Sequence, residues 1–278
     1  MSATATVPTS PAGRSAARSV PAGVRVTFPR LVRSEWIKLW TVRSTWWVVP
    51  ITFLAQAGIA WLIAYFGTQQ PMTLGGEGPV SAAMLVGGIQ FAQLAICVLA
   101  VLTVTGEYST GMIRSTLTAA PARTPALVAK GLVLLVVAFV TGVIGTVLSW
   151  AVTYPVLGET YRVDLADATN QRILLGAPLY LTAIALLAFA IGALLRHSAG
   201  ALATVLGLLL VVEGILSMIP WTFFETISPY LPMSAGSQLV MSGNPEAVLG
   251  PWEGFGVLVA WGVVATIAAT VLLKRRDA

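Results

Sequence analysis

Six stretches of this 278-residue chain are long and apolar enough to cross a lipid bilayer as helices. A hydrocarbon core about 30 Å thick requires roughly 20 consecutive apolar residues in helical form. Charged residues make up only 10% of the sequence, whereas soluble domains carry about 25%, so this chain cannot cover a water-facing surface. We therefore expect a polytopic membrane protein whose membrane domain covers residues 44–273, with spans at 44–66, 81–104, 131–154, 174–195, 199–219 and 253–273.

The spans are expected to be helices, so that the fold class is all-α. In lipid, a helix satisfies every backbone N–H and C=O group within its own segment. The strands of a membrane β-barrel alternate between apolar and polar residues, but runs such as residues 131–139 are apolar without alternation.

The distribution of basic residues predicts how the spans are oriented. Lys and Arg accumulate in the cytoplasmic connections of membrane proteins. Of the 16 Lys and Arg residues, 14 fall in the N-terminal tail, in the second and fourth connections, or at the C-terminus, and the other two are Arg162 and Arg172. We therefore expect both termini in the cytoplasm and a location in the cell membrane. Residues 1–26 lack the apolar run of a signal peptide, so we expect them to form a disordered cytoplasmic tail, with a second tail at 274–278.

Residues 27–43 have the pattern of an amphipathic helix that lies on the inner leaflet. Most of their apolar residues fall within one half of a helical wheel, and Trp36 and Trp40 lie one turn apart on it. Glu35 interrupts the apolar half and Ile37 faces away from it. The segment is either a simple lead-in to the first span or a functional connecting helix.

The connection between the second and third spans carries an apolar group of residues outside the membrane. Residues 111–117 can form one or two helical turns that end before Pro121. Thr124 and Pro125 are typical of a helix start, so the third helix is expected to begin about one turn before the bilayer. Met112, Ile113 and Leu117 would then form an apolar knob beside Arg114 and Arg123. Because an apolar knob in water is costly, we expect a partner to cover it.

Residues 34–40 with Arg43 and Ser44, together with the segment from Glu107 to Lys130, resemble the membrane subunit of ABC exporters of the type-2 permease class. The resemblance implies that two such subunits, identical or different, form one translocation pathway and rest on two cytoplasmic ATPase subunits that bind ATP and Mg. It further implies that Glu107 holds the loop to the connecting helix through Arg33 or Lys38. The residues implied in coupling to the ATPase are Glu107, Gly111, Met112, Ile113, Arg114, Leu117 and Arg123, and those of the connecting helix are Glu35, Trp36, Lys38 and Trp40.

The chain itself carries no pattern of an enzyme. None of its lysines follows a glycine as a phosphate-binding P-loop requires, so ATP hydrolysis is expected in another polypeptide and no cofactor in this one. A single histidine, His197, and a single cysteine, Cys97, leave no metal-ligand cluster and no His-based catalytic pair. The net charge of +5 follows from membrane orientation, so no nucleic acid is expected as a partner.

Polar residues inside the spans leave other functions open. Glu213, well inside the fifth span, is either a proton site of an ion-coupled secondary transporter or a carboxyl group hydrogen-bonded to a neighbouring helix. Gln56, Gln90 and Gln93 either line a pathway or form interhelical hydrogen bonds. The apolar segment 220–252 is expected to form short helices that either cap a pathway or pack on the bundle rim. A membrane anchor or sensor that transports nothing is a further alternative.

Overall fold

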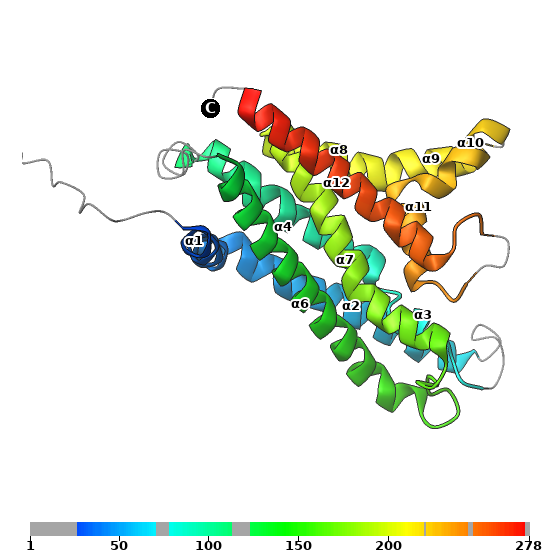
Figure 1. Ribbon diagram of the computed structural model, residues 1–278. Coiled ribbons are helices and arrows are strands. Elements are labelled where there is room, and N and C mark those ends of the chain that lie inside the picture. Colours follow the sequence, from blue (N-terminus) through cyan, green and yellow to red (C-terminus); the bar gives the residue numbers. More distant parts are fainter. Residues whose placement is uncertain (1–26, 71–77, 113–122, 220, 244–246, 276–278) are drawn as a thin grey trace, which may run out of the picture.

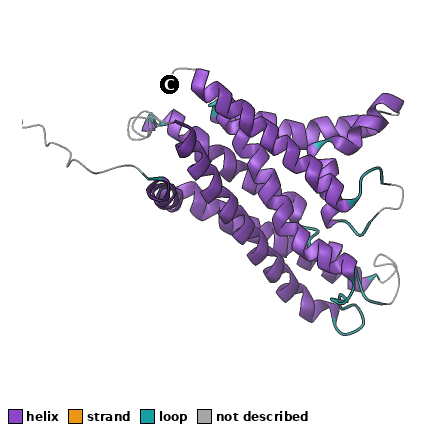
Figure 2. Ribbon diagram, viewed as in Figure 1, coloured by secondary structure: helices purple, strands orange, loops and turns teal. Residues whose placement is uncertain are grey.

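The computed structural model describes residues 27–70, 78–112, 123–219, 221–243 and 247–275, and these form helices without a strand among them (Figures 1 and 2). Six helical segments are long and apolar enough to cross a membrane, as the sequence predicts: Arg43–Gln69, Ile89–Ser109, Thr124–Leu157, Ala168–Leu195, Ser198–Leu216 and Pro251–Arg275. The prediction of an all-α fold with six helices long and apolar enough to span a membrane is thereby confirmed. The predicted tail 1–26 lies outside the described residues, as do residues 276–278.

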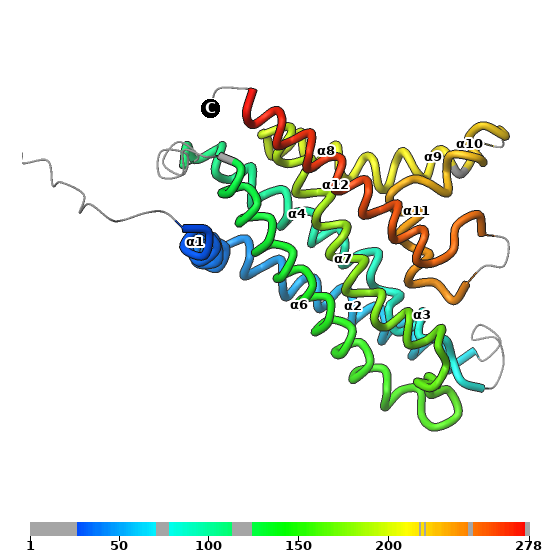
Figure 3. The backbone as a smooth tube through the Cα atoms, viewed as in Figure 1, coloured from blue at the N-terminus to red at the C-terminus, as the bar shows by residue number. Residues whose placement is uncertain are grey.

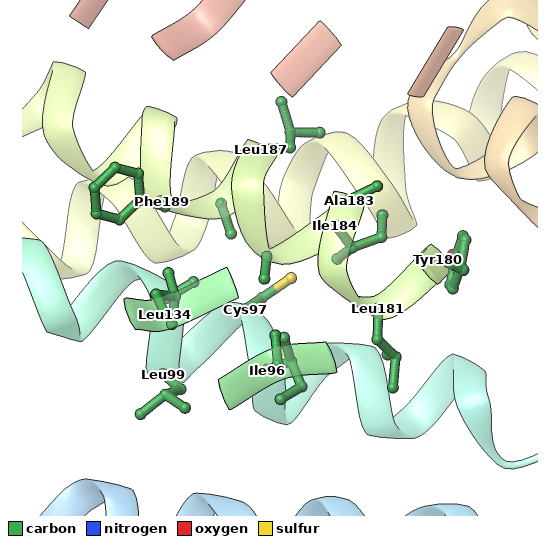
Figure 4. Close-up of a cluster of buried hydrophobic side chains, with 14 of the residues drawn as sticks. Ile96, Cys97, Leu99, Leu134, Tyr180, Leu181, Ala183, Ile184, Leu187 and Phe189 are labelled. Atoms are coloured by element: carbon green, nitrogen blue, oxygen red, sulfur yellow. The ribbon is translucent and has the colours of Figure 1, made fainter. Parts of the chain in front are cut away.

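Helix α7 (Ala168–Leu195) is the most buried of the six and forms the centre of the bundle. On one side it contacts α4 (Ile89–Ser109) and α6 (Arg123–Leu157), and on the other α12 (Pro251–Arg275). Figure 4 shows side chains of α4, α6 and α7 meeting in the apolar core, among them Ile96, Leu134 and Ile184. Helix α2 (Arg43–Gln69) covers the outer side of α4 and α6.

Glycines allow these helices to approach one another closely. A Cβ atom at Gly142 of α6 would lie 2.7 Å from the Cα of Pro178 in α7, so the two backbones pack directly. Gly192 of α7 faces the backbone of Val101 in α4 in the same way. Small residues at crossings are the usual means by which membrane helices associate.

The second span is divided, contrary to the prediction of one helix over 81–104. A short helix α3 (Ala82–Leu85) is followed by a break, and α4 begins at Ile89. At the break, Gly88 packs against the backbone of α2, where an added Cβ would lie 2.5 Å from the carbonyl oxygen of Ala55. The turn at Gly87 and Gly88 brings the chain against α2, and α4 then runs to Ser109, beyond the predicted end.

The fifth span also departs from a regular helix. Helix α8 (Ser198–Leu206) continues into a six-residue π-helix, η2 (Gly207–Val212), and then into α9 (Glu213–Met218). Each π-helical turn holds an extra residue, so it rotates the residues that follow relative to an α-helix. The first of those residues is Glu213.

The segment after the fifth span forms four short helical elements: α10 (Thr222–Ile227), η3 (Ser228–Tyr230), α11 (Pro232–Ser237) and η4 (Gln238–Val240). Short helices interrupted near Pro229 and Pro232 agree with the sequence prediction. Helix α11 and η4 are buried and contact α7 and α12. This part of the segment thus lies within the bundle wall rather than on its rim.

Helix α1 (Phe28–Thr41) lies across one end of the bundle and is seen nearly end-on in Figure 1. Val42 has an extended conformation and separates α1 from α2. The C-terminal end of α12 lies at the same end of the molecule (Figures 1 and 3). We refer to it as the α1 end.

Candidate functional site

Four charged side chains meet at the α1 end and form the ion cluster: Glu35 and Lys38 of α1, Glu107 of α4 and Lys130 of α6. The Nζ of Lys38 lies 2.8 Å from Glu35 Oε1 and 2.8 Å from Glu107 Oε1. The Nζ of Lys130 donates to Glu107 Oε1 at 2.9 Å and also to Glu35 Oε2. Each lysine therefore bridges both carboxylates, and the cluster joins three helices.

The cluster is largely removed from solvent. Glu35, Glu107 and Lys130 are 4%, 6% and 7% exposed, and Lys38 lies partly exposed at its edge. Two positive and two negative charges give the cluster no formal net charge. Buried charges are tolerated when they are paired in this way, which explains why Glu35 lies on the otherwise apolar half of α1.

Lys38 is held in its charged form by this arrangement. Burial by itself lowers the pKa of Lys38, but the hydrogen bonds to Glu107 and Glu35 and the charges of these two residues outweigh it. The pKa of Lys38 is therefore raised above its ordinary value.

Further contacts fix α1 against the start of α2. The hydroxyl of Thr45 donates to the carbonyl of Leu39 at 2.6 Å, and the indole N–H of Trp46 donates to the carbonyl of Trp40 at 2.8 Å. These bonds satisfy carbonyls at the C-terminal end of α1, which lack partners within the helix. The rings of Trp36, Trp40 and Trp46 follow one another edge to face, with centroids 6.0 and 5.8 Å apart. α1 is thus held on both its charged and its aromatic sides.

The structure describes only part of the predicted coupling residues. Helix α4 ends at Ser109, and Gly111 adopts φ of 73°, a left-handed conformation that favours glycine. Met112 is 44% exposed. Ile113, Arg114 and Leu117 lie outside the described residues, and Arg123 begins α6 with its side chain not described. The predicted apolar knob is therefore described only at Met112.

The expected contact between Glu107 and the connecting helix is present, and its partner there is Lys38 rather than Arg33. Sequence analysis missed that Lys130 completes the contact and that Glu35 is one of its members. The signal was the position of Glu35 on the apolar half of α1: a carboxylate directed toward the bundle needs a buried cation there.

Glu213 caps a helix that follows it in the chain. Its Oε1 accepts the backbone N–H of Met233 at 2.7 Å, and its Oε2 accepts both the backbone N–H and the hydroxyl of Ser234 at 2.7 Å. These N–H groups belong to the first turn of α11, where an acceptor is needed. Glu213 therefore binds the segment after the fifth span to α9.

Arg172 of α7 holds the other end of the same segment. Its guanidinium donates to the carbonyls of Gln238, Leu239 and Met241 at 3.0, 2.8 and 2.9 Å. The segment from α11 to η4 thus has a carboxylate at its N-terminus and a guanidinium at its C-terminus, which complements the helix dipole at both ends. Sequence analysis did not single out Arg172, because its acceptors are main-chain carbonyls, which every residue has.

The three glutamines form two separate interhelical contacts. Gln93 of α4 donates to Gln90 at 2.8 Å and accepts the hydroxyl of Tyr180 in α7 at 2.5 Å. Gln56 of α2 donates to Thr146 of α6 at 3.2 Å. The side chains of Gln56 and Gln93 are completely buried, so both connect helices rather than line an open channel in this conformation.

No group of three or more potential metal ligands occurs within the described ranges. No protein-family model matches the chain, and no curated protein matches it in sequence.

Proposed function

We propose that this chain is the membrane-spanning permease subunit of an ATP-driven exporter, which works as a dimer on separate cytoplasmic ATPase subunits that bind ATP and Mg. The observation that carries the proposal is the ion cluster. The cluster connects α1 to the end of α4 and to the first turns of α6. Helices α4 and α6 flank the connection at residues 110–122. A subunit driven through this loop needs such a connection.

The cluster supports a mechanical role for the loop. Glu107 lies three residues before the loop, and Lys130 lies two turns into α6. A displacement of the loop moves both helix ends, and the bridging lysines pass that displacement to α1. Because separating buried charges is costly, the three elements are expected to move as one body.

The exposed side chain of Met112 supports a partner at this position. Met112 follows the left-handed turn at Gly111 and lies beyond the end of α4. An exposed, adaptable methionine beside basic residues suits insertion into an apolar groove of a partner protein. In this proposal the α1 end, with Lys274 and Arg275 of α12 beside it, faces the cytoplasm and the ATPase.

The contacts of Glu213 support this function over ion-coupled transport. A proton site must exchange its proton with a pathway, whereas both oxygens of Glu213 are engaged by hydrogen-bond donors of α11. The carboxylate thus has a structural task that does not require transport of ions.

Co-purification tests the proposal. The chain, expressed with an affinity tag in its native cells, is expected to retain a P-loop ATPase that Met112→Asp and Leu117→Asp release, because a charge cannot enter an apolar groove unpaired. Met241→Asp is the matched control, since Met241 is 46% exposed, as Met112 nearly is, but lies at the opposite end of the bundle. If no ATPase is retained, or if Met112→Asp and Met241→Asp behave alike, the proposal is wrong.

A further inference from the structure

A pocket of about 160 Å³ lies at the end of the bundle opposite the α1 end, where α6 ends and the connection to α7 begins (Figure 1). Its lining is apolar at Leu85 of α3 and Leu157 of α6, which belong to one small buried cluster. Trp150 and Tyr154 of α6 also line the pocket and are exposed, with their ring centroids 5.2 Å apart. The pocket is thus apolar inside and reaches the surface beside two aromatic rings.

The length of α6 places this pocket at the depth of lipid headgroups. Lys130 and Tyr154 are 24 residues apart on this helix, and a rise of about 1.5 Å per residue puts them about 36 Å apart along it. The hydrocarbon core of a bilayer is about 30 Å thick, so when the ion cluster lies at one boundary of the core, Tyr154 lies close to the other. Trp and Tyr side chains are enriched at this depth in membrane proteins. Lipid headgroups therefore surround the pocket.

Arg162 brings a positive charge to the lining of the pocket. Its guanidinium lies over the ring of Tyr154, with Cζ 4.5 Å from the ring centroid, and this cation–π contact holds it in place. Its distance of 3.8 Å from Glu159 is too long for a hydrogen bond, and it forms none with the described residues. Arg172, by contrast, donates to three main-chain carbonyls. The donors of Arg162 thus remain available to an anionic group.

The charges around Arg162 favour a ligand that also carries a positive group. The connection at residues 158–167 contains three carboxylates, of Glu159, Asp164 and Asp167, and no basic residue besides Arg162. Asp164 and Asp167 accept backbone N–H groups, whereas Glu159 accepts no hydrogen bond from the described part of the chain and is 90% exposed in its side chain. A purely anionic ligand would be repelled by these carboxylates. A ligand with one negative and one positive group can pair with Arg162 and Glu159 together.

Chemistry decides which charged groups fit. A phosphate matches the guanidinium, which can bind two of its oxygens at once. A primary ammonium can donate hydrogen bonds to the carboxylate of Glu159. The quaternary ammonium of a choline head has no hydrogen to donate, and Tyr154, whose ring could hold it, already holds Arg162. The pocket is smaller than the roughly 300 to 1,000 Å³ typical of small-molecule sites, so it suits the beginning of one acyl chain rather than a whole lipid.

We propose that this pocket binds a phosphatidylethanolamine molecule of the bilayer. Arg162 binds its phosphate, Glu159 binds its ammonium group, and the beginning of one acyl chain lies against Leu85 and Leu157. The site lies at the end of the bundle opposite Met112, where the proposed ATPase would bind. It requires only that the six helices span a bilayer and does not depend on the proposed transport function.

Photolabelling of the full chain in phosphatidylcholine nanodiscs tests the proposal. The probe is a phosphatidylethanolamine with a diazirine near the start of one acyl chain, and labelled peptides are identified by mass spectrometry. We expect labelling at the C-terminal end of α6 and in residues 158–167. Excess unlabelled phosphatidylethanolamine should remove it, whereas phosphatidylglycerol, which has no ammonium group, should not. Water-soluble phosphoethanolamine should not remove it either, because it has no chain to place in the pocket. Removal by phosphatidylglycerol or by phosphoethanolamine as effective as that by phosphatidylethanolamine overturns the proposal.

Two variants each remove one charge of the site, and one control removes a charge beside it. Arg162→Gln and Glu159→Gln change side chains that are at least partly exposed, so the helical bundle should persist, which circular dichroism checks. Each should reduce labelling at least about tenfold, because each removes a charge-assisted hydrogen bond. In Glu159→Gln, phosphatidylglycerol should also become a competitor, since the repelling carboxylate is gone. Asp164→Asn removes a negative charge from the same connection but keeps the oxygen that binds Ala166, and it should leave labelling unchanged. Labelling that persists in both folded variants, or that falls equally in Asp164→Asn, overturns the proposal.

Discussion

Glu107 and Lys38 are 69 residues apart in the chain, yet Oε1 of Glu107 lies 2.8 Å from Nζ of Lys38. The same oxygen accepts a hydrogen bond from Lys130 at 2.9 Å. One carboxylate oxygen thus connects the helix across the α1 end to two of the long helices. A group with this position is expected to matter for both stability and movement at this end of the bundle.

Replacing Lys130 tests the stability of the cluster. Lys130→Met leaves Glu35 and Glu107 buried with only Lys38 between them, so we expect the free energy of unfolding to fall by about 3 to 5 kcal/mol, as for other broken buried pairs. Unfolding in mixed micelles titrated with a denaturing detergent measures the change. The control is Arg162→Met, because Arg162 forms an exposed ion pair with Glu159 at 3.8 Å, for which the loss should be below about 1 kcal/mol. Equal losses in the two variants would contradict this role.

Replacing Glu213 tests its capping of α11. Glu213→Ala removes three hydrogen bonds to one carboxylate, and bonds to charged groups are worth about 1.5 to 3 kcal/mol each. We expect α11 to open more often, so that a cysteine at the buried position of Ser237 reacts with a maleimide at least tenfold faster. The measurement uses Ser237→Cys in a Cys97→Ala background. Glu225→Ala, on the exposed surface of α10, should not change the rate. An unchanged rate in Glu213→Ala would show that the carboxylate does not hold α11.

Arg172 should act on the same segment from its other end. Arg172→Met removes donors to three carbonyls, so the cysteine at position 237 should again react faster. Because both residues hold one short segment, we expect their effects to overlap. The reaction rate of the double variant Arg172→Met with Glu213→Ala should rise by a factor smaller than the product of the factors for the two single variants. A rate increase equal to that product would mean that the two ends of the segment from α11 to η4 open independently. Arg162→Met serves as the control for loss of a basic residue at the same end of the bundle.

The sequence predicts the six spans because apolar length is a local property that lipid thickness converts directly into helices. The contact between Glu107 and α1 is expected only from the family resemblance, and the structure contains it through Lys38. The place of Lys130 could not be predicted, since it depends on how α6 packs against α1. The roles of Glu213 and Arg172 stayed hidden for a related reason: their partners are backbone groups, and only the tertiary fold shows which of these lack a helical partner.

Gly88 tests why the second span is divided. A Cβ at this position would lie 2.5 Å from the carbonyl oxygen of Ala55, so Gly88→Ala must push α2 away from the start of α4. We expect a loss of about 1 to 3 kcal/mol in the free energy of unfolding, as for other overpacked sites. Gly58→Ala is the control, because its Cβ meets nothing within 4 Å and alanine favours a helix by about 1 kcal/mol. If Gly88→Ala is as stable as Gly58→Ala, the close approach does not explain the break.

The pKa of Lys38 predicts how the α1 end responds to alkaline pH. Its hydrogen bonds to Glu107 and Glu35 raise the pKa above the ordinary value of 10.5. The folded protein therefore binds the Lys38 proton more tightly than the unfolded chain does. The resulting stabilisation is fully present below about pH 10.5 and disappears as the pH rises through the pKa of the folded state. We expect the free energy of unfolding, measured from pH 9 to pH 12, to fall more steeply for the wild type than for Lys38→Arg, whose guanidinium stays protonated throughout this range. Because both proteins contain the same tyrosines, the difference between the two curves isolates Lys38, and parallel curves would mean that its charge contributes nothing to the fold.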